Sequence, residues 1–282
     1  MILTLAICFL SSPLREHSKW TAPSQLPFER AHAIARVDAE TYIGGLRGLY
    51  KGGEGNWMKL DERPVKQMVV DKKSVWVLYG DGSLDKIEPR TNRLIFDVLN
   101  GKAKRPWTSC LYRDSKGVVL GGLGGWIERG DRTAETYLKE FGDDVVTSIC
   151  RTESDLWIGT QRRGVFSFKS AGLRRFGFAA GLPDSWVTAT LYFKKQLLVG
   201  VADGGIVRKS GEKFTAFESP CRKVRFLAEY KSRLVVGGME GCWVQDGKSW
   251  QQLSNEETTC LSVISSKLAV GSPTSLRWWS ES

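Results

Sequence analysis

Short apolar segments alternate with glycine-containing turns along nearly the whole chain. Seven copies of one pattern occur, each an apolar segment, a glycine, a short turn and a second apolar segment, and they begin at Thr41, Val75, Gly117, Asp155, Leu197, Leu234 and Leu268. Their anchor residues Gly44, Tyr79, Gly121, Gly159, Gly200, Gly237 and Gly271 are 35, 42, 38, 41, 37 and 34 residues apart. This period is typical of a four-stranded propeller blade. The pattern predicts an all-β fold, a seven-bladed β-propeller of antiparallel blades.

The fourth copy shows the four expected strands of a blade, here named A to D. Strand A begins at Asp144, strand B at Leu156, strand C at Val165 and strand D at Arg174. Each is about five residues long, rich in Val, Ile, Leu, Phe and Trp, and bounded by turn residues, which favours strand over helix. No stretch keeps a helical period over three turns, so any helix is expected to be short and peripheral.

The two ends of the chain predict how the ring is closed. The seventh copy ends after strands B and C, whereas the segment from His17 to Ser24 precedes the first strand A and resembles the strand D segments that begin at Gly55 and Lys248. We therefore expect the N-terminal segment to supply the outer strand of the last blade, which leaves no strand edge unpaired.

Length and composition fit one domain. A chain of 282 residues divided among seven blades gives about 40 residues each, and 41% hydrophobic with 26% charged residues is ordinary for a globular protein. We expect a single propeller over residues 13–282. Residues 1–12 contain an apolar run from Ile2 to Leu10, shorter than the roughly 20 residues of a membrane span. An export signal is expected there; a misassigned start or a buried apolar end is the alternative, because no basic residue precedes the run.

The cysteines do not form a recognisable metal motif. If Cys8 leaves with a signal segment, an odd number remains, namely Cys110, Cys150, Cys221, Cys242 and Cys260, with no C-x-x-C and only two histidines. Zinc-ligand spacing is absent. Three of them fall in predicted strands A, where a small buried thiol is expected; disulfide pairing stays open.

The fourth and fifth copies resemble the two-component regulator propeller repeat. The match consists of two motifs, G-L-P followed by V-T and L-W-I-G-T, carried here by Gly181, Leu182, Pro183, Val187 and Thr188 and by Leu156, Trp157, Ile158, Gly159 and Thr160. The resemblance implies a sensor-type propeller outside the cytoplasmic membrane, hence a periplasmic or secreted location; a cytoplasmic location is the alternative. In such hybrid regulators a membrane helix and a kinase follow; here any signalling output would lie on another protein. The resemblance implies a fold and a ligand-binding role, but no enzymatic activity.

The clearest chemical feature of the sequence is its excess of positive charge. The chain has 41 Lys and Arg against 31 Asp and Glu, a formal net charge of +10, which favours an anionic partner. Propeller topology places the A–B and C–D turns on one face, where basic residues outnumber acidic ones. The opposite face, built from the B–C turns and the D–A connections between blades, mixes both signs and is called the D–A/B–C face below. Nucleic acid is not favoured, because no basic stripe is interleaved with exposed aromatics.

Few residues could support catalysis. His32, in the first strand A, is the only histidine expected near the central channel, while His17 lies in the closing strand. No G-x-S-x-G, H-E-x-x-H or calcium-loop motif occurs, and the Asp-Gly pairs at Asp81 and Asp203 are typical of hairpin turns. A propeller lyase or hydrolase acting on a sugar or lactone is the enzyme alternative, in which His32 would be essential.

These observations favour a monomeric, non-catalytic ligand-binding or sensing module, without metal or cofactor. Its expected partner is an anionic or small-molecule ligand, or a protein if the chain is an interaction scaffold. The D–A/B–C face is the usual docking surface of ring propellers. The ligand-binding residues predicted on it are Arg47, Asp81, Arg162, Arg163, Trp186, Asp203 and Glu240.

Overall fold

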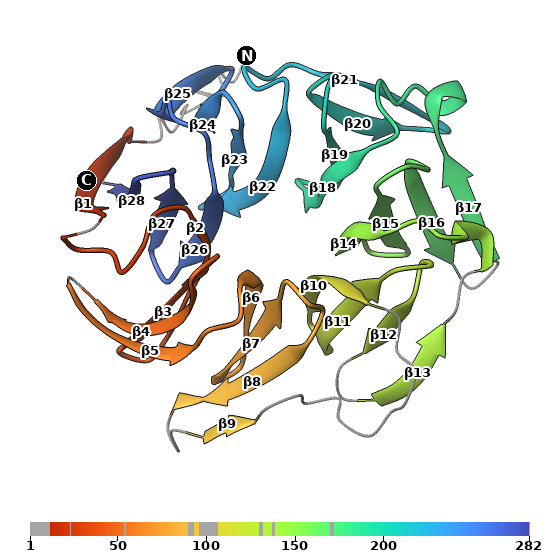
Figure 1. Ribbon diagram of the computed structural model, residues 1–282. Helices are drawn as coiled ribbons and strands as arrows, with labels where there is room; N and C mark the ends of the chain where they lie inside the picture. The colour runs from red at the N-terminus through yellow and green to blue at the C-terminus, as the bar shows by residue number, and fades with distance from the viewer. Residues whose placement is uncertain are drawn as a thin grey trace, which may run out of the picture.

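Seven four-stranded antiparallel sheets surround a central channel in the computed structural model (Figure 1). The predicted all-β, seven-bladed propeller is confirmed. The structure describes residues 12–22, 24–53, 55–89, 93–95, 107–129, 132–136, 139–169 and 172–281. The apolar run predicted as an export signal lies outside the described residues.

The first four blades follow the chain in order. Blade 1 contains β2 (Ala31–Val37), β3 (Glu40–Gly45), β4 (Gly48–Gly53) and β5 (Asn56–Asp61). Blade 2 contains β6 (Val65–Asp71), β7 (Ser74–Tyr79), β8 (Leu84–Glu88) and β9 (Arg93–Ile95). Blade 3 contains β10 (Thr108–Asp114), β11 (Gly117–Gly122), β12 (Ile127–Arg129) and β13 (Arg132–Thr136). Blade 4 contains β14 (Val146–Arg151), β15 (Leu156–Thr160), β16 (Val165–Lys169) and β17 (Gly172–Phe176).

Blades 5 and 6 also follow the chain in order, and blade 7 combines both ends of the described chain. Blade 5 contains β18 (Val187–Phe193), β19 (Gln196–Val201), β20 (Ile206–Ser210) and β21 (Lys213–Phe217), and blade 6 contains β22 (Val224–Tyr230), β23 (Arg233–Gly238), β24 (Gly241–Asp246) and β25 (Ser249–Ser254). Blade 7 has the strand order β1-β28-β27-β26, from β1 (Leu14–Thr21), β28 (Ser275–Glu281), β27 (Lys267–Gly271) and β26 (Cys260–Ile264). Here β1 is the outer strand and lies antiparallel to β28.

The anchor glycines let neighbouring blades approach each other closely. A Cβ atom on Gly44 or Gly200 would lie 2.4 or 2.5 Å from the Cγ1 of Val65 or Val224, the first strand A residue of the next blade. These contacts are shorter than van der Waals packing permits, so only glycine fits without movement. The repeated glycine of the sequence pattern is therefore a requirement of blade-to-blade packing.

The anchor predicted for the second blade is wrong by one residue. Leu78 pairs with Gln67 as Gly44 pairs with Ala33, so Leu78 and not Tyr79 takes the anchor position. A glycine is not needed there because Leu78 itself fills the space toward blade 3, in a buried cluster with Leu111 and Leu120.

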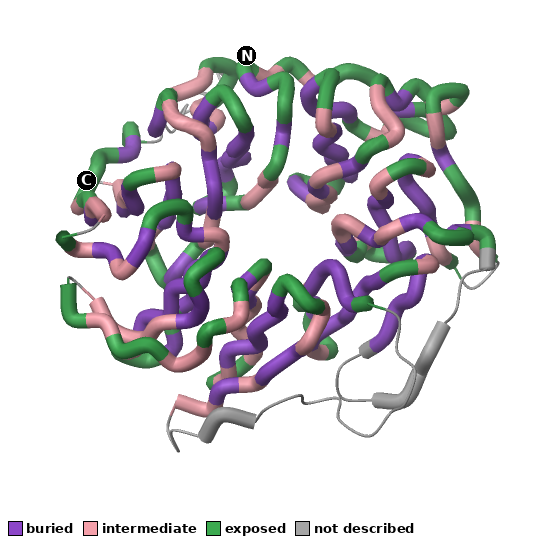
Figure 2. The backbone as a smooth tube through the Cα atoms, in the orientation of Figure 1, coloured by how far each residue is buried: buried purple, intermediate pink, exposed green. Residues whose placement is uncertain are grey.

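Buried residues run through the middle of the blades, and exposed ones gather at turns and outer edges (Figure 2). Trp76 and Trp157 are 6% and 5% exposed, as expected for rings packed between blades. The described cysteines are all buried and free of disulfides. Burial raises the pKa of Cys110, Cys150 and Cys260, in strands A as predicted, to about 12.

Helical structure in the described ranges includes two single turns of 3-10 helix, η2 (Lys139–Phe141) and η3 (Phe178–Ala180), both in D–A connections. None of the helices described has the length and apolar character of a membrane span.

Candidate functional site

Six strands A share one irregularity near their first residue. The pairing of each strand A with its strand B skips one residue, as in a β-bulge. A bulge leaves its extra residue outside the ladder and redirects its side chain. The skipped residues are His32, Lys66, Ser109, Thr147, Thr188 and Arg225.

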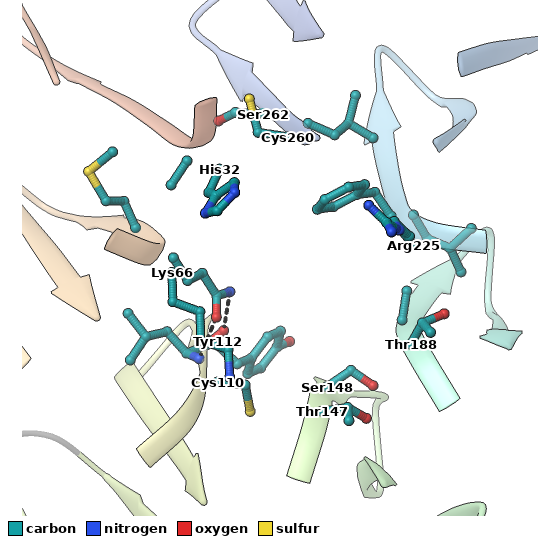
Figure 3. A pocket seen from close by; sticks show the side chains of 18 of the residues that line it. His32, Lys66, Cys110, Tyr112, Thr147, Ser148, Thr188, Arg225, Cys260 and Ser262 are labelled. Atoms are coloured by element: carbon teal, nitrogen blue, oxygen red, sulfur yellow. Dashed lines mark hydrogen bonds between the residues drawn. The ribbon is translucent and has the colours of Figure 1, made fainter. Parts of the chain in front are cut away.

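These six residues line a cavity at the start of the strands A, on the D–A/B–C face. Because the four strands of a blade alternate in direction, strand A begins at the end of the blade where strands B and C are joined. The cavity has a volume of about 360 Å³ and is lined by all seven strands A (Figure 3). Its described lining contains no Asp or Glu.

Four of the skipped residues tie each blade to the next. Ser109, Thr147 and Thr188 donate their hydroxyl hydrogens to the backbone carbonyls of Val146, Val187 and Val224, at 2.5, 2.6 and 2.7 Å. His32 makes the matching contact from its Nδ1 to the carbonyl of Val65, at 3.3 Å. Each acceptor is the residue just before the skipped residue of the following blade. The skipped residues thus stabilise the contacts between neighbouring blades and also line the channel.

Lys66 departs from this scheme. Its ammonium lies 4.4 Å from the ring centroid of Trp107, a cation–π contact. Although the residue as a whole is exposed, the surrounding protein still desolvates the ammonium and lowers the pKa of Lys66. No ion pair of Lys66 occurs among the described residues. The neighbouring Gln67 exchanges two 2.8 Å hydrogen bonds with the backbone of Leu111, which holds blades 2 and 3 together inside the channel (Figure 3).

A charged cluster joins three blades beside the cavity. Glu257, in the connection before β26, accepts hydrogen bonds from Arg30 at 2.9 and 2.8 Å and from Arg225. Burial opposes ionisation of Glu257, but the hydrogen bond from Arg30 and the charges of both arginines outweigh it and lower the pKa of Glu257. One carboxylate therefore faces two guanidinium groups.

The lowered pKa of Glu257 makes stability depend on pH. A carboxyl whose pKa is lower when folded stabilises the protein above its ordinary pKa of about 4.3, and this contribution is lost as pH falls through the folded value. Glu257→Gln should therefore cost about 1 kcal/mol at neutral pH, and the cost should vanish in acid. Thermal unfolding from pH 7 to pH 3 measures this, with exposed Glu218→Gln as the control. A cost that is unchanged at pH 3 contradicts the prediction.

His32 lines the cavity, as expected. Burial lowers the pKa of His32, and the charges of Arg30 and Arg225 add to this, while the hydrogen bond to Val65 and the charge of Glu257 act against it. The imidazole is therefore neutral near pH 7 and carries its proton on Nδ1, since a carbonyl can only accept. Within the described ranges, no group of three or more His, Cys, Asp or Glu could hold a metal ion.

Exposed large apolar side chains gather on the D–A/B–C face. Of the eight in the described residues, six lie in B–C turns or D–A connections: Leu46, Trp107, Leu123, Phe178, Trp186 and Met239. The other two, Met58 and Val263, lie in strands β5 and β26. Apolar groups concentrated on one face indicate an interaction surface more strongly than the same groups scattered singly.

All seven ligand-binding residues predicted from the sequence lie in B–C turns or D–A connections, and none lines the cavity. Arg47, Asp81, Arg162, Arg163, Asp203 and Glu240 are in B–C turns and Trp186 is in the connection from β17 to β18. Trp186 is 47% exposed and Arg47 is also exposed. These two are free to contact a ligand on this face.

Most of the others hold the turns themselves in place. Arg162 pairs with Asp143 at 2.9 Å, and Arg163 donates to the carbonyl of Glu140 at 3.2 Å, so both fasten a B–C turn to the preceding D–A connection. Asp81 accepts from the backbone of Ser83, and Glu240 from that of Lys223. Asp203 faces Arg222 at 3.7 Å.

Sequence reasoning missed five of the six skipped residues. The available signal was the residue after the first valine of strand A, as in Val65-Lys66, Val187-Thr188 and Val224-Arg225. The V-T step of the repeat motif already contained one of them, Thr188.

Solved structures with the same fold include extracellular domains of hybrid two-component systems. The chain aligns with the extracellular domain of BT3049 from B. thetaiotaomicron, described as a hybrid two-component system, with a TM-score of 0.76 and 15% identity, over 95% of this chain and 41% of that one. The extracellular domain of BT4673 from the same organism gives a TM-score of 0.71 and 15% identity, over 96% and 43% of the two chains. BamB from Moraxella catarrhalis aligns with a TM-score of 0.60 and 13% identity, over 95% and 98%.

The chain therefore spans about two fifths of these extracellular domains. No family model and no curated protein sequence matches it. Likeness at such low identity shows the fold, which is the one that the resemblance in the sequence implied.

Proposed function

We propose that the chain is a non-catalytic binding module of the sensor type, which presents the D–A/B–C face to its ligand outside the cytoplasm. The observation that carries this proposal is the concentration of exposed apolar side chains on that face. The fold shared with extracellular domains of two-component systems supports the sensing role and the location. The enzyme alternative gains no comparable support, because the described cavity lining contains no carboxylate and the nearby Glu257 is paired with Arg30 and Arg225.

The proposal is tested by comparing two surface variants. One replaces Leu46, Trp186 and Met239, all on the D–A/B–C face, by serine; the control replaces Met58 and Val263, which lie elsewhere, by serine. Each protein is heated with neutral sugars, small acids, acidic oligosaccharides and nucleic acid, since a compound that binds the native state raises the melting temperature.

We expect at least one compound to raise the melting temperature of the wild type and the control but not that of the face variant. Repeating the measurement in high salt separates a pocket ligand from a polyanion held by surface charge. The proposal is contradicted if no compound stabilises the wild type, or if every compound that does so stabilises all three proteins equally and also stabilises Lys66→Gln, a variant of the cavity on the same face.

A further inference from the structure

The cavity mouth carries an excess of positive charge. Arg30 and Arg225 share the single carboxylate of Glu257, and the ammonium of Lys66 has no anionic partner among the described residues. The described cavity lining offers no carboxylate. The site therefore suits an anionic group and gives a ligand's ammonium group nothing to pair with.

The remaining side of the mouth offers hydrogen-bond acceptors. Thr147 and Thr188, in adjacent blades 4 and 5, give their hydroxyl hydrogens to backbone carbonyls of the next blade. A hydroxyl has one hydrogen, so what each Oγ1 has left for a ligand is its capacity to accept. Lys66, in blade 2, faces Thr188 across the channel, whereas Arg225, in blade 6, lies beside Thr188 (Figure 3).

We propose that this cavity binds a small hydroxylated acid, whose carboxylate or phosphate group pairs with Lys66 while its hydroxyl groups donate to Thr147 and Thr188. The inference rests on the proposed function and names the ligand class of the same face. At about 360 Å³, the cavity is at the small end of ligand pockets, which range over roughly 300–1,000 Å³. It therefore suits a single acid of about six carbons rather than a polymer segment.

Lys66 is suited to this role by its surroundings. Trp107 covers one side of the ammonium, and the protein desolvates it, so an acid group placed beside it meets less competing water than at the open surface. Arg225, which shares Glu257 with Arg30, adds attraction from the other side of the channel (Figure 3).

Calorimetric titration with four probes separates the parts of the proposal. Gluconate carries a carboxylate and hydroxyls, glucose 6-phosphate a phosphate and hydroxyls, glucose hydroxyls alone, and hexanoate a carboxylate alone. We expect gluconate or glucose 6-phosphate to bind, and glucose and hexanoate to bind at least tenfold more weakly. Which of the first two binds more tightly decides between a carboxylate and a phosphate ligand.

Four variants assign the contacts. Lys66→Gln should weaken binding at least tenfold, and Lys66→Arg, which keeps the charge, should retain most of it. Lys73→Gln removes the same charge from an exposed turn on the opposite face and should change nothing. Thr188→Val should weaken gluconate or the phosphate but leave hexanoate unchanged. Circular dichroism and melting temperature establish that each variant is folded.

The inference is overturned if neither gluconate nor glucose 6-phosphate binds the wild type, or if Lys66→Gln binds as tightly as Lys73→Gln. In that case, a compound whose stabilising effect still depends on Leu46, Trp186 and Met239 would keep the proposed function and remove only this site. If neither experiment gives the expected result, both the proposed function and the cavity site are wrong.

Discussion

Replacing Arg63 by methionine is expected to lower the free energy of unfolding by about 3–5 kcal/mol. Arg63 pairs with the fully buried carboxylate of Asp85 and with Asp61 at 2.8 Å, donates to Ser83 at 2.9 Å, and lies 3.8 Å from the ring centroid of Tyr79. The hydrogen bond to Asp61 outweighs burial and raises the pKa of Arg63, so it stays charged. Methionine fills similar space but leaves Asp85 buried without this guanidinium.

Urea denaturation followed by tryptophan fluorescence measures this loss. Arg113→Met is the matched control, because Arg113 pairs with Asp71 at 3.1 Å on the surface, where an ion pair contributes about 1 kcal/mol or less. In a double-mutant cycle with Asp85→Asn, the two losses should be less than additive, because each removes the same interaction. Equal effects of Arg63→Met and Arg113→Met would show that the buried pair contributes no more than a surface one.

Replacing Gly200 by alanine is expected to cost about 2–3 kcal/mol, although it adds a single methyl group. The new Cβ would lie 2.5 Å from the Cγ1 of Val224, so blades 5 and 6 must move apart or Val224 must change its rotamer. For a chain of this length the melting temperature should fall by about 5 °C or more.

Two further variants test whether the cause is the approach of the blades. Gly53→Ala should be nearly neutral, because its Cβ would meet its nearest atom, in Trp20, at 3.9 Å. Adding Val224→Ala to Gly200→Ala should make the double variant more stable than the sum of the two single effects predicts, because the closest contact, at 2.5 Å to Cγ1, is removed and the next, to Cβ, is at 3.1 Å. A similar loss for Gly53→Ala and Gly200→Ala would point to backbone flexibility instead.

The fold was readable from the sequence because its main constraint repeats. Most anchor glycines mark a place where two blades touch, as at Gly44, Gly159 and Gly200, so the blade period appears directly in the residue spacing. Leu78 shows where prediction from glycine spacing fails. A side chain that fills the gap toward the next blade serves in place of glycine, and nothing local marks it as equivalent.

The site was less readable, because it depends on register and on residues distant in sequence. His32 was expected near the channel, but Lys66 and Arg225 become part of the same mouth only through a one-residue skip in strand pairing. The sequence also does not reveal which charged side chains pair with each other. Arg162 was predicted to bind a ligand, yet it is committed to Asp143, whereas Lys66, which no motif marks, lacks such a partner in the described chain.

The skipped residue in each strand A has no opposite number in the ladder, so its identity does not set the pairing of the blade. Mutation at these six codons can therefore change the channel lining without changing the register within a blade, but at His32, Ser109, Thr147 and Thr188 it also removes a hydrogen bond to the next blade. Lys66 has the most freedom, since it makes none of the side-chain bonds that tie one blade to the next. A combinatorial library at these positions would show how far the channel lining can change while the ring still folds.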